Sequence, residues 1–241
     1  TSEYCSELAT DHNKSIVKEK TGLLIDSYFS ATKIKWILDN IEGARAKAEA
    51  GELCFGTVDT YLMYRLSAGK LFKTDITNAS RTMLFNINTL RWDDELLKLF
   101  DIPKTLLPEV IHSDSCFGSL SELGDITIHA VLGDQQAALF GQGCLEKGQL
   151  KSTYGTGCFI MSNVGDKPIH SDDGLLTTIG FSLNGKVYYA VEGSIYASGT
   201  TVQWLRDNLQ FFDKSDQSET YLNEDGNANN VLFIPAFTGL G

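Results

Sequence analysis

The sequence predicts an α/β protein in two parts, with the boundary between Gly143 and Gly148. The first part contains short helical segments with polar residues at their starts and glycine or proline beyond their ends, the usual signals of helix boundaries. It closes with an apolar run, a Gly-Asp turn and a further helical segment, as in a βα unit. The second part opens with several strand-like runs in succession. We therefore predict one domain at residues 1–145 and another at 146–241.

Capping residues and breakers define the helices of the first part. Ser30 or Thr32 can cap a helix that follows, and Gly51 ends an alanine-rich helix. Asp93 starts an acidic helix, and Pro103 lies beyond its end. The expected elements are helices over 33–41, 43–50, 61–66, 95–100 and 135–142, strands over 53–58 and 128–132, and an irregular segment over 108–124.

Strand patterns dominate the start of the second part. Asn184-Gly185 is a strong signal for a tight turn between two antiparallel strands. A helix is expected further on because Val202, Leu205, Leu209 and Phe212 share one helical face. The expected elements are strands over 149–154, 158–163, 175–182 and 187–191, a helix over 197–212, a surface loop over 213–230 and a buried strand over 231–237. A strand meander, a helix and a further strand form the order of a ribonuclease H-like half.

Charge and cysteine usage narrow the class of protein. The formal charge of -11 and the isoelectric point near 4.8 argue against nucleic acid or an anionic membrane as the main partner. No stretch has the length of a transmembrane helix, so membrane insertion is not expected. The five cysteines are widely scattered and form no Cys-x-x-Cys pair. We expect a reduced, cytoplasmic protein without a zinc site.

Two segments suggest chemistry on a phosphate. The apolar run ending at Gly133-Asp134 predicts a buried strand that brings a lone carboxylate to its carboxyl end, where ligands bind in open α/β sheets. Gly155-Thr156-Gly157 predicts a glycine hairpin whose backbone can approach a phosphate. A proton-accepting carboxylate facing a phosphate loop is the minimum equipment for phosphorylating an alcohol. A helix cap at Asp134 and a plain hairpin tip at Thr156 are the alternative interpretations.

Other polar segments give weaker signals. Gln135 can bind a hydroxyl group through its amide, although a glutamine in the first helical turn is often only solvated. The segment Gly199–Gln203 lies at a helix start, where backbone amides can receive phosphate oxygens. Tyr28 can line a polar pocket or simply pack. For the polar segment 78–82, a hinge or interface role and ordinary turn chemistry both stay open.

The sequence resembles the FGGY carbohydrate kinases. The segment Tyr28–Asn40 is similar to the first signature of that family, and the similarity is strongest to the members that phosphorylate glycerol. Further blocks that resemble the family run in order along the chain, at residues 56–60, 77–86, 133–141, 153–159, 203–207 and 235–241.

The resemblance implies an actin-like ATPase fold of the ribonuclease H type, in a two-lobed kinase of which both lobes are incomplete here. Residues 1–145 would form the carboxyl-terminal part of the first lobe, which carries the substrate and the catalytic base. Residues 146–241 would form the first part of the second, nucleotide-binding lobe. The implied reaction is the ATP-dependent phosphorylation of glycerol to sn-glycerol 3-phosphate in glycerol catabolism, in a protein that is a homo-oligomer when full length.

Individual roles also follow from the resemblance. Asp134 would be the general base for the attacking hydroxyl of glycerol, and Tyr28, Asp134 and Gln135 would hold the glycerol hydroxyl groups. Phe159 would pack on the carbon backbone of glycerol. The residues expected to contact ATP are Thr156, Gly199 and Gln203. Mg²⁺ would bridge the phosphates of ATP, with no metal ligand assigned to the protein.

Some family features do not occur in this sequence. The Asp-x-Gly-Thr phosphate loop and the Arg-Glu pair that contacts glycerol are both missing. We therefore expect an internal piece of a longer kinase, unable to turn over alone. Two alternatives stay open: another FGGY kinase acting on a pentulose or similar polyol, and a non-catalytic actin-like protein that binds nucleotide.

Overall fold

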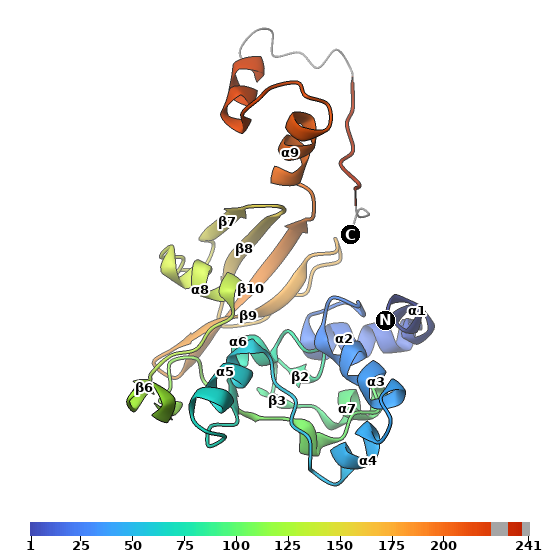
Figure 1. Cartoon of the computed structure of the whole chain (residues 1–241), viewed down its shortest axis with the longest axis vertical. Coiled ribbons are helices and arrows are strands. Elements are labelled where there is room, and N and C mark those ends of the chain that lie inside the picture. Colours follow the sequence, from blue (N-terminus) through green and yellow to red (C-terminus); the bar gives the residue numbers. More distant parts are fainter. Residues whose placement is uncertain (223–230, 238–241) are drawn as a thin grey trace.

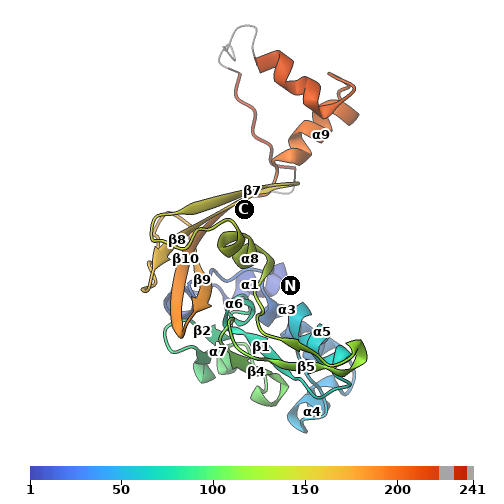
Figure 2. The same ribbon diagram turned by 90° about the vertical axis from the view of Figure 1, so that its left-hand side faces the viewer.

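A computed structural model describes residues 1–222 and 231–237. Figure 1 shows a mostly helical region that contains the amino terminus, an antiparallel sheet beside it, and a carboxyl-terminal arm beyond the sheet. The arm comprises residues 199–222 and 231–237. In the perpendicular view of Figure 2, the arm stands clear of both the sheet and the helical region.

Short helices make up most of the helical region. They are α1 (Ser2–Leu8), α2 (Asp11–Thr21), α3 (Ser30–Asn40), α4 (Ala44–Glu49), α5 (Val58–Leu66), α6 (Ile76–Ala79), α7 (Asp94–Leu99) and α8 (Asp134–Gly141), with 3₁₀ turns η1 (Lys104–Leu106) and η2 (Ser121–Leu123). The predicted cap of α3 is wrong. Ser30 is already helical, Phe29 takes the capping position, and no side chain caps the helix there.

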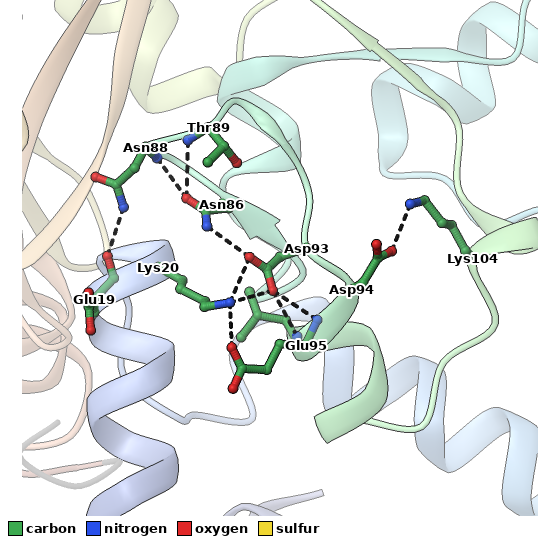
Figure 3. Close-up of polar contacts among 10 residues, drawn as sticks. Glu19, Lys20, Asn86, Asn88, Thr89, Asp93, Asp94, Glu95 and Lys104 are labelled. Carbon is green, nitrogen blue, oxygen red and sulfur yellow. Dashed lines mark hydrogen bonds and ion pairs between the residues drawn. The ribbon is translucent and has the colours of Figure 1, made fainter.

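The predicted acidic start of α7 is confirmed, and Figure 3 shows the polar cluster around it. The Asp93 carboxylate accepts hydrogen bonds from the backbone amides of Glu95 and Leu96, which the helix itself leaves unsatisfied. The same carboxylate accepts bonds from Lys20 Nζ at 2.8 and 2.9 Å and from Asn86 Nδ2 at 2.8 Å. One carboxylate therefore joins the end of α2 to the start of α7.

The strands of the helical region are short and pair in twos. Their bounds are β1 (Lys73–Asp75) parallel to β4 (Glu109–Ile111), β2 (Phe85–Asn86) antiparallel to β3 (Arg91–Trp92), and β5 (Gly118–Leu120) antiparallel to β6 (Ile126–Ile128). The strand expected over 53–58 does not form, because this segment meets η1 through an isolated bond from Phe55 N to Leu106 O. The segment over 108–124 is more regular than expected, since it contains β4 and β5.

The four strands predicted at the start of the second part are confirmed. A four-stranded antiparallel sheet has the order β7-β8-β10-β9. Its strands are β7 (Leu150–Tyr154), β8 (Cys158–Gly165), β9 (Leu176–Leu183) and β10 (Lys186–Ile195). The tight turn between β9 and β10 forms as predicted, with φ of 53° at Asn184 and 76° at Gly185. Positive φ at both turn residues matches the twist of the two strands.

Apolar packing joins the sheet to the helical region. Leu139 of α8 is buried with Phe181 of β9 and Ala190 of β10. On the other side, Ile76 of α6 and Phe85 of β2 are buried in one cluster with sheet residues. The sheet is thus held between α8 and the β2–α6 segment, and the start of α8 lies where the two parts of the chain meet (Figure 2).

The arm differs from its prediction. Helix α9 (Gly199–Asp207) is shorter than the expected helix over 197–212, and Gln210 beyond its end has a φ of 54°. A 3₁₀ helix, η3 (Ser215–Leu222), occupies part of the expected loop, whose residues 223–230 lie outside the described residues. The expected buried strand over 231–237 is wrong, because Leu232 is 84% exposed and only Phe237 makes an isolated bridge.

Within residues 1–222 and 231–237, no helix combines the length and the apolar character needed to cross a membrane.

Candidate active site

The turn before α8 is held by a buried polar network. Gly133 N donates to Thr77 Oγ1 at 2.9 Å, which ties the start of α8 to α6. The Asp75 carboxylate is fully buried and accepts bonds from the backbone amides and side chains of Thr77 and Asn78 and from Ser113 Oγ. Burial raises the pKa of Asp75, and these bonds oppose the rise. The network fixes the position at which α8 begins.

The predicted buried strand before this turn is wrong. Strand β6 ends at Ile128, its residues are partly or fully exposed, and residues 129–133 are not in a strand. β6 pairs with β5 alone, and Val131 N instead donates to Ser113 O at 3.0 Å. The prediction of a carboxylate directly before a helix nevertheless comes close, because Asp134 is the first residue of α8.

Asp134 is exposed, and its carboxylate is free to face a ligand. Gln135 Nε2 donates to Asp134 Oδ2 at 3.3 Å. A carboxylate in this position can accept a proton from a bound hydroxyl group.

A cavity of about 760 Å³ lies in front of this pair. Its volume is within the roughly 300–1,000 Å³ of small-molecule sites. Tyr28, Asp134 and Gln135 all line it, so three of the four predicted substrate residues lie together. Arg81 and Glu192 line it as well.

A second cavity of about 350 Å³ adjoins the first. Phe159, the fourth predicted substrate residue, lines this smaller cavity. Tyr28, Phe29, Arg81 and Glu192 line both cavities. The structure therefore brings Phe159 close to the other three residues without placing it in the same cavity.

Two of the three predicted nucleotide residues lie side by side. Gly199 N donates to Gly155 O at 2.9 Å, and Ser198 N and Thr200 N donate to Thr156 O at 2.9 and 3.2 Å. A Cβ atom at Gly199 would be 2.4 Å from Gly155 O. The loop over residues 155–157, called the glycine loop below, thus already accepts the hydrogen bonds of these amides. That they receive phosphate oxygens stays a prediction.

The third nucleotide residue, Gln203, lies one turn further along α9 with an exposed side chain. Neither of the two cavities is lined by Thr156, Gly199 or Gln203. The structure thus forms one group around Asp134 and another at the glycine loop.

Sequence reasoning missed three charged residues at the site. Arg81 Nη1 and Glu192 Oε2 are 2.9 Å apart, and the Arg81 guanidinium lies 5.3 Å from the ring centroid of Phe29. Lys151 is 1% exposed and donates to Gln135 Oε1. Arg81 lies in the polar segment whose role stayed open, and the structure assigns it a contact between the two parts of the chain. For Lys151 and Glu192 the only signal was a charged residue within or beside an expected strand.

No group of three or more histidine, cysteine, aspartate or glutamate side chains is placed to hold a metal ion in the described part of the chain.

Comparison with known families decides the classification. Residues 1–141 match the N-terminal domain of the FGGY family of carbohydrate kinases, and residues 150–241 match the C-terminal domain of that family. The chain belongs to the FGGY family of carbohydrate kinases. The two matched segments meet beside α8, where the cavity of Asp134 lies.

Curated relatives of this FGGY chain include two bacterial enzymes. The chain is 53% identical over 245 residues to the glycerol kinase of Bacillus mycoides (strain KBAB4) and 54% identical over 244 residues to glycerol kinase 1 of Pseudomonas aeruginosa. Both alignments cover 100% of this chain and 49% of the relative. The chain therefore spans about half the length of the curated relatives it matches.

Solved structures show the same fold. The crystal structure of Plasmodium falciparum glycerol kinase with ADP has a TM-score of 0.91 and 38% identity, covering 98% of this chain and 48% of that one. Ligand-bound xylulose kinase from Lactobacillus acidophilus has a TM-score of 0.84 at 19% identity, covering 99% of this chain and 48% of that one. The predicted actin-like ATPase fold is confirmed, and this chain holds part of it.

Proposed function

We propose that the protein containing this chain phosphorylates glycerol with ATP, and that Asp134 is the general base. One observation carries the proposal: Tyr28, Asp134 and Gln135 line one cavity in a chain more than half identical to glycerol kinases. The cavity has room for a small polyol and places a carboxylate beside an amide, which are groups that hydrogen-bond hydroxyl groups.

The chemistry asks the site mainly for positioning and charge stabilisation. The terminal hydroxyl oxygen of glycerol forms a bond to the γ-phosphorus of ATP while the bond between that phosphorus and the bridging oxygen breaks. The hydroxyl proton passes to the Asp134 carboxylate, and the products are sn-glycerol 3-phosphate and ADP. Tyr28 and Gln135 hold hydroxyl groups of glycerol, and Phe159 packs on its carbon atoms.

The nucleotide is proposed to bind at Thr156 and Gln203, with Gly199 supporting the loop through its bond to Gly155. Because carbonyl groups of the glycine loop accept the bonds of the first α9 amides, the Thr156 hydroxyl and the Gln203 amide are the groups left for polar contact with ATP. Mg²⁺ would arrive with ATP and be held by its phosphate oxygens, the usual mode for this ion. Residues 1–145 would thus supply the substrate and base, and 146–241 the first nucleotide contacts.

The cellular location is a further part of the proposal. All five cysteines are free thiols in the structure. Free cysteines are typical of a reducing compartment, so they support a cytoplasmic protein.

The test uses the full-length protein that contains this chain. ADP release is measured with glycerol, with a pentulose and with no acceptor, for the wild type and for Asp134→Asn. We expect glycerol-dependent turnover that falls at least about 100-fold in Asp134→Asn, as for loss of a general base, with ATP affinity unchanged in a binding titration. Turnover with the pentulose but not with glycerol would favour another polyol kinase. Nucleotide binding without any turnover would favour a non-catalytic protein.

A further inference from the structure

Lys151 is a charged side chain in an unusual place. It lies within β7, and only 1% of it is exposed. A lysine is almost never fully buried unless its ammonium group has partners, since the loss of hydration is costly. An ammonium group has three N–H donors and no acceptor. The identity of its three partners therefore shows what the buried charge does.

The three partners of Lys151 Nζ come from three elements. The ammonium donates to Gln135 Oε1 on α8, to Thr153 Oγ1 on β7 at 2.9 Å, and to the Phe159 carbonyl on β8 at 3.4 Å. Gln135 and Phe159 are both residues proposed to contact glycerol. Lys151 thus connects two substrate-contacting residues from behind the cavity, and it is not a cavity-lining residue itself.

The bond to Lys151 decides which way the Gln135 amide points. Because the ammonium cannot accept a hydrogen bond, only the oxygen of the amide can face it. The amide nitrogen must then point the other way, and Gln135 Nε2 does donate to Asp134 Oδ2 at 3.3 Å. Lys151 therefore determines which atom of the Gln135 amide faces Asp134.

Nearby charges support this arrangement. Burial lowers the pKa of Lys151, whereas the carboxylates of Glu192 and Asp134 favour its charged form. Glu192 is itself 4% exposed and is paired with the half-buried Arg81, so two cations, Lys151 and Arg81, lie near two carboxylates, Glu192 and Asp134.

We propose that Lys151 is a positioning residue that locks the Gln135 amide with its N–H groups toward Asp134 and the substrate. The inference rests on the proposed function of Asp134 and Gln135. Gln135 then donates to the oxygen of a glycerol hydroxyl, while the Asp134 carboxylate accepts a proton. Without Lys151 the amide can rotate and present its oxygen, which cannot donate a hydrogen bond to the Asp134 carboxylate or to the hydroxyl oxygen.

A double-mutant cycle in the full-length protein tests this. We expect Lys151→Met to lower kcat/KM for glycerol about 10- to 100-fold, the scale of a misplaced contact, with KM for ATP unchanged. Gln135→Ala should give a similar loss. Since both changes remove the same oriented N–H donor, the double variant should be no worse than Gln135→Ala. Losses that multiply in the double variant would overturn the proposal. Lys151→Gln keeps N–H donors for Gln135 Oε1, so it should retain more of kcat/KM than Gln135→Ala does. An equal loss would overturn the proposal, even should the methionine variant fail to fold.

A second readout does not depend on turnover. In protein labelled with nitrogen-15 at glutamine, the Gln135 side-chain signal is assigned by its loss in Gln135→Glu. We expect this signal to shift in Lys151→Met while the other glutamine signals stay in place. An unchanged Gln135 signal would overturn the proposal even in an active enzyme. If the Gln135 signal shifts in Lys151→Met but the wild-type protein does not phosphorylate glycerol, the result would contradict the proposed function instead.

Discussion

Arg81 and Glu192 form an ion pair in which Glu192 is buried and Arg81 half-buried, with 2.9 Å between Arg81 Nη1 and Glu192 Oε2, and a second contact of 3.2 Å from Nη2 to Oε1. Arg81 follows α6 in the helical region, and Glu192 lies on β10 of the sheet. The pair therefore connects the two parts of the chain next to Tyr28, and both residues line both cavities.

Removing the charge of one partner should lower the stability of the protein. We expect Glu192→Gln to lower the free energy of unfolding by about 2 kcal/mol, because the half-buried Arg81 loses its charged partner. Urea unfolding of the full-length protein measures the change. The double variant Arg81→Met with Glu192→Gln should lose less than the sum of the two single variants. Additive losses would show that the two residues do not act as a pair.

The hydrogen bonds to Asp75 predict that a conservative substitution at this residue lowers the stability of the protein. Asp75→Asn keeps the size of the side chain but turns one acceptor into an NH₂ group that faces donors from Thr77 and Ser113. We expect a loss of about 2–3 kcal/mol, the scale of hydrogen bonds to a charged group. Thermal unfolding measures it. Ser113→Ala, which removes a single donor, is the matched control and should cost clearly less.

The Lys20–Asp93 pair predicts a pH dependence. Burial alone would raise the pKa of Asp93, but the hydrogen bonds from Lys20 and Asn86 outweigh it and hold that pKa below its usual 3.8. A carboxyl group with a lowered pKa binds fewer protons in the folded state, so its contribution is complete above pH 3.8 and lost as the pH falls through the folded pKa. Burial would lower the pKa of Lys20, but its bonds to Asp93 and Glu95 raise it above 10.5.

Asp93→Asn isolates this contribution, because asparagine also caps helices well. We expect the wild type to exceed the variant by about 1–2 kcal/mol near neutral pH, and the difference to shrink below pH 3.8. Melting temperatures of both proteins at a series of pH values measure it. A difference that stays constant down to pH 2 would contradict the assignment.

The glycine loop predicts a separate effect on the nucleotide. In Gly199→Ala the new Cβ would meet Gly155 O at 2.4 Å, so the loop must move. We expect KM for ATP to rise about 10-fold or more, the scale of a small misplacement, while KM for glycerol changes little. Gly141→Ala is the control, because nothing lies within 4 Å of the added atom. An unchanged KM for ATP in Gly199→Ala would remove this loop from the nucleotide site.

Local patterns proved predictable where neighbouring residues decide the structure. The Asn184-Gly185 turn and the Asp93 cap both depend on residues within a few positions of each other. The strand predicted from the apolar run before Asp134 was wrong for a related reason. Leu132 packs against the cluster around Leu139 and also lines the large cavity, so its apolar character serves packing and not a strand. An apolar run reports burial, and burial alone does not specify a strand.

The sequence by itself determined the family and the start of a helix at Asp134, because these depend on motifs that are continuous in the chain. Through the resemblance to the family it also predicted the residues around glycerol. Only the tertiary structure decided which charged residues contact the residues of the site. Lys151 and Gln135 are 16 residues apart, and Arg81 and Glu192 are 111 apart. Such partners are brought together by the packing of α8 and α6 against the sheet, which no local pattern of residues specifies. The tertiary structure therefore revealed the charged residues Lys151, Arg81 and Glu192 beside the site.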